Sequence, residues 1–267
     1  MTLSKEQVAR YSRQLILPEL GVKGQEKLLG GSVLVIGAGG LGSPACLYLA
    51  AAGVGRIGLA DPDTVSPSDL HRQILHSTAA QASLKVDSAK ARLEALNPAV
   101  CVETFPEAIT AHNARSLISR YDVVVDGADN FPTRYLANDA CVLESKPLVH
   151  GAVVRFEGQL FTVIPGRSAC LRCVFPEPPQ PEAIPRCQEA GVLGPEAGVI
   201  GSLMAHEALK LLAGVGELLT DRLLVMDGWA SRFREVAVRR NPDCAVCGDS
   251  PTITAAEAYA AMPGCAS

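Results

Sequence analysis

No part of this 267-residue sequence is long and apolar enough to cross a membrane. The first residues, Met1–Glu6, also lack the apolar core of a signal peptide. These two absences argue against a membrane protein and against a secreted one. We therefore expect a cytoplasmic protein that binds no membrane.

The sequence also lacks an excess of charge of either sign, with 24 basic and 28 acidic residues. Proteins that bind nucleic acids usually carry a basic excess, and we therefore predict no nucleic-acid partner. A G-x-x-x-x-G-K-[ST] loop is missing as well, which excludes a P-loop enzyme. What the sequence has in quantity is apolar residues, at 48%, and these can form a large core in one domain.

The nine cysteines are an odd number in a chain without a secretion signal, so we do not expect disulfides to be its framework. Four of them form two C-x-x-C pairs, Cys170 with Cys173 and Cys244 with Cys247. Four thiolates fill the tetrahedral site of a structural Zn²⁺, which is the interpretation that two matched pairs favour. A redox role for one pair is the alternative. We expect three further cysteines to be small buried hydrophobes: Cys46, Cys101 and Cys141.

The clearest motif follows the four apolar residues that begin at Val33. It is G-x-G-x-x-G, with Gly37 for a tight turn, Gly39 for the approach of a phosphate, and Gly42 for close packing of helix on strand. Asp61 ends a second apolar strand, at the separation where a carboxylate usually binds ribose hydroxyls. The sequence therefore predicts a nucleotide site.

Strand and helix patterns alternate through the first 150 residues and predict an α/β fold with a doubly wound, Rossmann-like and mostly parallel sheet. After Lys146 we expect further strands that extend this sheet. One domain is predicted over residues 1–250, with N-terminal helices at 4–30, a nucleotide-binding core at 31–150 and a zinc-binding part at 151–250. The tail, 251–267, is expected to be a short helix or disordered. The expected helices include 4–17, 84–96 and 196–213, and the later strands include 100–104, 123–126, 148–153, 157–164, 223–226 and 233–238.

Charged residues decide which nucleotide the pocket suits. Arg72, Lys85 and Asp129 follow strand ends and are expected at the same edge of the sheet, with Arg13 available from elsewhere. Cations offset phosphate charge and a carboxylate holds Mg²⁺, which favours a triphosphate. An NAD-dependent oxidoreductase with a structural zinc is the alternative, but it leaves these charges without a task.

Together, these motifs resemble the MoeB/ThiF/HesA family, the bacterial relatives of ubiquitin-activating enzymes. The resemblance extends from residue 4 to 248. The matching residues are Gly37–Pro44, Asp61, Ser68, Leu70, Arg72, Gln73, Lys85, Asp129, Asn130, the two cysteine pairs and Cys187–Leu193. Family members use MgATP to adenylate the C-terminal glycine of a small ubiquitin-like sulfur carrier, MoaD-like or ThiS-like and ending in Gly-Gly, and they release pyrophosphate. The resemblance implies the same reaction here, with ATP, Mg²⁺ and Zn²⁺, and a carrier-binding surface within 151–250.

The resemblance also implies roles for individual residues. Asp61 would bind the ribose, Arg72 and Lys85 would face the phosphates, and Asp129 would hold Mg²⁺. Arg13 would reach into the neighbouring subunit's site, which implies a homodimer with shared active sites. The other residues expected around the nucleotide are Gly37, Gly39, Gly40, Gly42, Ser68, Asp69, Leu70, His71, Gln73 and Asn130.

Two of these positions carry open questions. The family has Asn where this chain has Asp69, and a carboxylate repels phosphates unless it binds metal or ribose. We therefore expect Asp69→Asn to keep or improve ATP affinity. Cys187 follows a proline-rich loop and either forms a covalent link with the carrier or is an unreactive loop thiol.

The partners are predicted only by class. The sequence leaves no room for a rhodanese-like domain, so we expect a separate sulfur donor, a cysteine desulfurase or a sulfurtransferase. The carrier could serve molybdopterin synthesis, thiamine synthesis or tRNA thiolation. A non-catalytic scaffold that binds the carrier is a further hypothesis.

Overall fold

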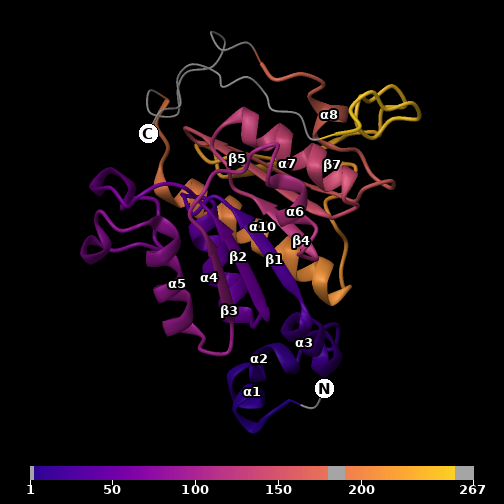
Figure 1. Cartoon of the computed structure of the whole chain (residues 1–267). Coiled ribbons are helices and arrows are strands. Elements are labelled where there is room, and N and C mark those ends of the chain that lie inside the picture. Colours follow the sequence, from indigo (N-terminus) through magenta and orange to yellow (C-terminus); the bar gives the residue numbers. More distant parts are fainter. Residues whose placement is uncertain (1–2, 180–189, 256–267) are drawn as a thin grey trace.

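The computed structural model describes residues 3–179 and 190–255, and it is built on one eight-stranded sheet (Figure 1). The strands lie in the order β3-β2-β1-β4-β5-β6-β7-β8. β1 to β5 are parallel, and β6, β7 and β8 continue the sheet as antiparallel strands. The predicted doubly wound sheet with C-terminal extension is thus confirmed. The bounds are β1 Ser32–Ile36, β2 Arg56–Ala60, β3 Cys101–Phe105, β4 Val123–Asp126, β5 Leu148–Val154, β6 Glu157–Val163, β7 Arg222–Asp227 and β8 Arg232–Ala237.

Helices cover both faces of this sheet and bury a hydrophobic core on each (Figure 1). One core lies under α4, α5 and α10, and the other under α6 and α7. None of the helices in the described part of the chain is both long and apolar enough for a membrane span. The helix bounds are α1 Lys5–Arg10, α2 Ser12–Leu15, α3 Gly21–Gly30, α4 Gly42–Ala52, α5 Lys85–Leu96, α6 Ala114–Ile118, α7 Phe131–Leu143, α8 Leu171–Val174 and α10 Gly194–Ala213.

The two central strands explain where a ligand can bind. β1 and β4 are buried at every position, as expected for strands with helices on both faces. From β1 the chain runs outward to β2 and β3, and it then returns to β4 on the other side of β1. The connections therefore diverge at the carboxyl ends of β1 and β4, and such a switch point is where doubly wound sheets bind ligands.

Three local predictions from the sequence differ from the structure. The helix expected over 4–17 is broken at Tyr11, which turns into the core and whose hydroxyl accepts a hydrogen bond from the Asn97 side chain at 2.9 Å. Leu96, expected on the buried stripe of α5, is 39% exposed because the helix ends there. Cys101 is exposed because it begins β3, the edge strand of the sheet.

The junction between β1 and α4 depends on two glycines. Gly37 has a φ of 90°, in the left-handed region that favours glycine. A Cβ atom at Gly42 would overlap the carbonyl oxygen of Gly37. Neither backbone group can move away easily, since the Gly37 N–H donates to the Ala60 carbonyl at 2.8 Å and α4 packs into the core.

We therefore predict that Gly42→Ala lowers the free energy of unfolding by more than about 2 kcal/mol, measured by urea denaturation. The matched control is Gly198→Ala in α10, where an added Cβ meets nothing within 4 Å. This control is expected to raise stability by up to about 1 kcal/mol, because alanine is the better helix former. Equal stability of the two variants would contradict the prediction.

Candidate functional site

Two backbone turns meet at the carboxyl edge of the sheet. One follows β1 at Gly37, and the other follows β4 at Gly127, whose carbonyl oxygen would lie 3.0 Å from a Cβ on Gly37. Asp61, at the end of β2, holds the first turn, because its Oδ2 accepts the Ala38 N–H at 2.7 Å. Asp61, predicted to bind the ribose, and the glycine turn, predicted to bind a phosphate, are therefore adjacent.

Lys85 lies beside this carboxylate, in the first turn of α5. Its Nζ contacts Asp63 Oδ2 at 2.9 Å, and its side chain is only 8% exposed. Burial acts to lower the pKa of Lys85, but the carboxylates of Asp61 and Asp63 outweigh it and raise the pKa above its usual range. Burial in turn raises the pKa of Asp61, which Lys85 opposes. Lys85 is thus a buried, permanently charged cation at the pocket.

The loop before Arg72 is organised by Asp69, whose side chain is 12% exposed. Its Oδ2 accepts the Ser66 N–H at 3.0 Å, while its Oδ1 accepts from Arg72 at 3.2 Å and from the Gln73 amide at 3.0 Å. Arg72 also donates to the Ser68 carbonyl at 2.8 Å. The carboxylate therefore orients the loop and its cation, a task that sequence reasoning did not assign to it.

The glycine turn has the open space that a nucleotide needs. A Cβ at Gly39 would meet only the Gln73 amide nitrogen within 4 Å, at 3.8 Å. The Oε1 of Gln73 and the hydroxyl of Ser43 are buried, and among the described residues they have no hydrogen-bond partner. An unpartnered buried polar atom costs about 1–3 kcal/mol, so such atoms often mark places where a polar ligand or water binds. These two atoms and the space at Gly39 are consistent with a polar ligand bound at the glycine turn.

Asp129 follows the second turn and is exposed at the same edge. Asn130 caps α7, with its side chain accepting the Thr133 N–H at 2.9 Å. Arg134, on the first turn of α7, donates from Nε to the Ala128 carbonyl at 3.0 Å and so holds the turn that precedes Asp129.

The remaining loop residues are also near the pocket. His71 is exposed, and its Nε2 lies 3.2 Å from Arg72 Nη1. Leu70 is half-buried and Ser68 is exposed. Gly40 lies between Arg72 and the start of α10, because a Cβ there would contact Ala197 and Arg72 side-chain atoms.

Arg13, a predicted catalytic residue, does not lie at this pocket within its own chain. Arg13 is exposed on α2. The side chain of its neighbour Gln14 donates, at 3.1 Å, to the carbonyl of Ala52, which is the last residue of α4. The glycine turn lies at the opposite end of α4, about 16 Å away for an 11-residue helix. Figure 1 shows α2 beyond the amino ends of the strands. Cys187 lies outside the described residues.

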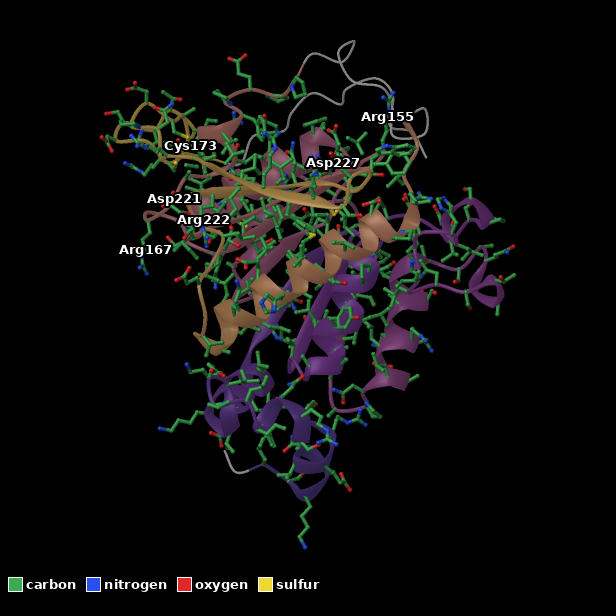
Figure 2. All side chains as sticks on the ribbon, turned by 180° about the vertical axis from the view of Figure 1, so that it is seen from behind. Arg155, Arg167, Cys173, Asp221, Arg222 and Asp227 are labelled. Carbon is green, nitrogen blue, oxygen red and sulfur yellow. The ribbon has the colours of Figure 1, made fainter. Side chains whose placement is uncertain are left out.

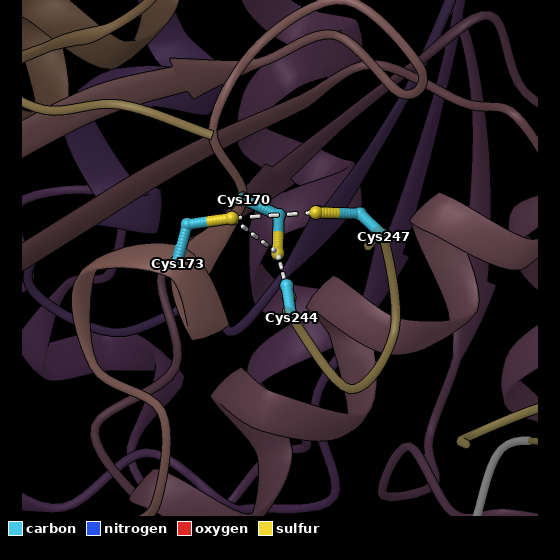
Figure 3. Close-up of side chains that lie close together, drawn as sticks. All are labelled: Cys170, Cys173, Cys244 and Cys247. Atoms are coloured by element: carbon cyan, nitrogen blue, oxygen red, sulfur yellow. Dashed lines mark hydrogen bonds between the residues drawn. The ribbon is translucent and has the colours of Figure 1, made fainter. Parts of the chain in front are cut away.

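The four paired cysteines form a separate cluster, shown in Figure 3. Their sulfur atoms all lie within 4.8 Å of one another. The Sγ–Sγ distances are 3.6 Å for Cys170 and Cys244, and 3.3 Å for Cys173 and Cys247. These values approach the roughly 3.8 Å edge of a tetrahedral site with 2.3 Å Zn–S bonds. The two C-x-x-C pairs thus form one group of ligands, and the cluster fits a closed, four-thiolate metal site.

Two contacts support this cluster from outside. The backbone N–H of Asn241 donates to Cys173 Sγ at 3.3 Å. Arg172, between the first two cysteines, forms a bidentate ion pair with Asp139 of α7, at 2.9 Å for both bonds. Figure 2 labels Cys173 at the end of the molecule where α8 lies against the C-terminal strands.

Comparison with known proteins now adds to this geometry. The model of the ThiF family matches residues 11–246. The chain belongs to the ThiF family. This confirms the resemblance predicted from the sequence motifs.

The ThiF-family relatives agree with this assignment. The chain is 52% identical to the sulfur carrier protein adenylyltransferase of Thermus thermophilus, over 94% of this chain and 95% of that protein. It is 50% identical to the pig (Sus scrofa) adenylyltransferase and sulfurtransferase MOCS3, over 98% of this chain but 58% of that protein. The chain thus spans a little more than half the length of MOCS3. The solved structure of E. coli MccB with MccA-N7isoAsn shares the fold, with a TM-score of 0.80, 24% identity, and coverage of 92% of this chain and 76% of MccB.

For the cysteine cluster we predict that Cys247→Ser abolishes metal binding and lowers the melting temperature by about 10 °C, because loss of a structural metal ranks among the largest single-residue effects. Metal content by atomic emission and melting by calorimetry check this. Cys101→Ser, outside the cluster and exposed, is the control and is expected to change neither. A wild-type protein purified without metal, and as stable as after reconstitution with Zn²⁺, would contradict the assignment.

Proposed function

We propose that the protein uses MgATP to adenylate the C-terminal glycine carboxylate of a small ubiquitin-like sulfur carrier, with release of pyrophosphate. The observation that carries this proposal is the Thermus relative, which is about half identical over nearly the full length of both proteins and is named a sulfur carrier protein adenylyltransferase. The pocket supports it through the cations beside the glycine turn.

The charges of the site favour this reaction over that of an NAD-dependent oxidoreductase. A dinucleotide needs the glycine turn and Asp61, and it leaves Lys85 and Arg72 without a task. Transfer of a nucleotidyl group needs both cations, because negative charge accumulates on the phosphates as pyrophosphate departs. The ThiF-family membership favours the same choice.

In the proposed mechanism the carrier carboxylate attacks the α-phosphorus of ATP. A new bond forms from the carboxylate oxygen to phosphorus, and the bond to the bridging oxygen of pyrophosphate breaks. Lys85 and Arg72 offset the charge on the phosphates, and Asp129 would hold Mg²⁺, which would neutralise part of the remaining charge. No protein base is needed, because a carboxylate is already ionised at neutral pH.

Arg13 supports a proposed homodimer. Within its own chain it is far from the glycine turn, so it can act in this reaction only at the pocket of a second copy. Its neighbours Ile16 and Leu17 are 68% and 50% exposed, which suits a surface that a second copy covers. We propose that Arg13 completes the partner's active site.

The sulfur chemistry and the location remain proposals as well. We propose a separate sulfur donor, a cysteine desulfurase or a sulfurtransferase, and Cys187 as the residue that links to the carrier. The metal of the cysteine cluster is proposed to be Zn²⁺, since four thiolates suit it. None of the described cysteines forms a disulfide, which is in keeping with a reducing compartment such as the cytoplasm.

The direct test is exchange of labelled pyrophosphate into ATP, in the presence of each small carrier ending in Gly-Gly from the same cell. Wild-type protein is expected to catalyse exchange with at least one carrier. Asp129→Asn is expected to reduce the rate at least about 100-fold, a loss typical of a group that stabilises transition-state charge. Glu94→Gln, an exposed carboxylate at the far end of α5, is the control and should leave the rate unchanged.

Two outcomes would overturn the proposal. Binding of NAD without exchange of pyrophosphate would identify an oxidoreductase. Binding of a carrier without exchange of pyrophosphate would identify a non-catalytic scaffold, and full exchange activity in Asp129→Asn would show that Asp129 has no part in the reaction.

The hydrogen bonds of Asp69 lead to a different prediction for Asp69→Asn from the one based on its charge. The carboxylate accepts three N–H donors through two oxygens, and asparagine offers only one acceptor oxygen. We predict that Asp69→Asn weakens ATP binding about threefold to tenfold. Either Arg72 or the Ser66 N–H then loses the carboxylate oxygen that accepts its hydrogen bond, and the loop loses its orientation. Titration calorimetry with ATP checks this, with Asp243→Asn, an exposed side chain near the cysteine cluster, as the control. Unchanged or tighter binding would support the charge argument instead.

A further inference from the structure

His76 is a buried histidine beside the glycine turn, only 8% exposed, to which the proposed reaction assigns no task. Its Nε2 lies 3.0 Å from the Ala38 carbonyl oxygen, and its Nδ1 lies 3.0 Å from the Ser88 hydroxyl. A carbonyl can only accept, so Nε2 carries the proton and the Ser88 hydroxyl donates to Nδ1. Burial lowers the pKa of His76, and Lys85 acts in the same direction, so the ring is neutral at neutral pH.

Two side chains hold the two consecutive peptide groups that flank the Cα of Ala38. The N–H of Ala38 donates to Asp61 at 2.7 Å, and its carbonyl accepts from His76. Ala38 lies between Gly37 and Gly39, which have no side chains to restrict the backbone. The orientation of the turn is therefore set by the two side chains that hold Ala38.

His76 also joins three segments that the nucleotide is expected to contact. It follows the Arg72 loop in the chain, it bonds to the glycine turn, and it bonds to Ser88 of α5. Ser88 lies three residues after Lys85, on the adjacent turn of the same helix. The imidazole thus fixes the spacing between the glycine turn and the helix that carries the buried lysine.

We propose that His76 is a positioning residue for ATP, which holds the Ala38–Gly39 peptide in place against α5 and so sets the affinity of the glycine turn for the nucleotide. This inference rests on the proposed function, because it takes ATP as the ligand. The turn contacts bound nucleotide before and during the reaction alike. Loss of its orientation therefore raises KM more than it lowers kcat.

The test compares His76→Leu with His76→Gln. It uses pyrophosphate exchange and calorimetric titration with MgATP in the absence of a carrier. Leucine removes both hydrogen bonds, whereas glutamine can donate to Ala38 and accept from Ser88. We expect His76→Leu to raise the KM and the Kd for ATP about tenfold, with kcat within about threefold of wild type. For His76→Gln we expect all three constants to stay within about threefold of wild type. The matched control is His112→Leu, an exposed histidine, which should change neither constant.

Ser88→Ala keeps the test decisive if His76→Leu does not fold, because it removes only the hydroxyl. It is expected to weaken ATP binding about threefold. The positioning role would be overturned if folded His76→Leu, or Ser88→Ala, bound ATP with wild-type affinity. It would also be overturned if folded His76→Gln bound ATP no better than His76→Leu. Wild-type protein that binds ATP but exchanges no pyrophosphate with any carrier would instead contradict the proposed reaction, and the titrations would still measure the role of His76.

Discussion

The N-terminus of α4 reaches the end of β1 only because Gly42 has no side chain that would strike the Gly37 carbonyl. This close approach aims the positive end of the helix dipole at the carboxyl edge of the sheet. It also brings the turn after β1 against the turn at Gly127, since β1 and β4 are hydrogen-bonded neighbours. The glycine turn and the turn that precedes Asp129 are therefore adjacent because of backbone packing.

The side chains around this turn carry balanced charges. Lys85 is buried beside Asp61 and Asp63, and Arg72 is held by Asp69. A buried cation without such partners would be too costly to keep in the charged form. Because these cations also pair with carboxylates, they can offset only part of the charge of a triphosphate. This is the physical reason why we propose that ATP binds together with Mg²⁺.

The sequence was sufficient to predict the doubly wound, mostly parallel sheet, because the central strands are continuous apolar runs and the glycine motif between a strand and a helix is typical of such sheets. The cysteine cluster was equally predictable, since C-x-x-C spacing is local and only the pairing of the two halves needed the fold. The break at Tyr11 could not be predicted, because a helical pattern does not show that the Tyr11 side chain lies in the core with its hydroxyl bonded to Asn97. Asp69 shows the same limit. Its charge suggested repulsion of phosphates, whereas its role follows from three N–H donors that only the folded loop brings together.

One helix, α7, connects the cysteine cluster with the region around Asp129. Arg172 lies inside the first C-x-x-C pair and forms a buried ion pair with Asp139 of α7, and the start of that helix follows Asp129 directly. Burial raises the pKa of Asp139, while Arg172 opposes the change, so the pair holds its charges only as long as both partners stay in place. Removing one partner of such a pair costs about 3–5 kcal/mol, so the pair strongly stabilises the contact between the cluster and α7. We therefore expect a metal in the cluster to stabilise the helix that follows Asp129 without itself taking part in the proposed reaction.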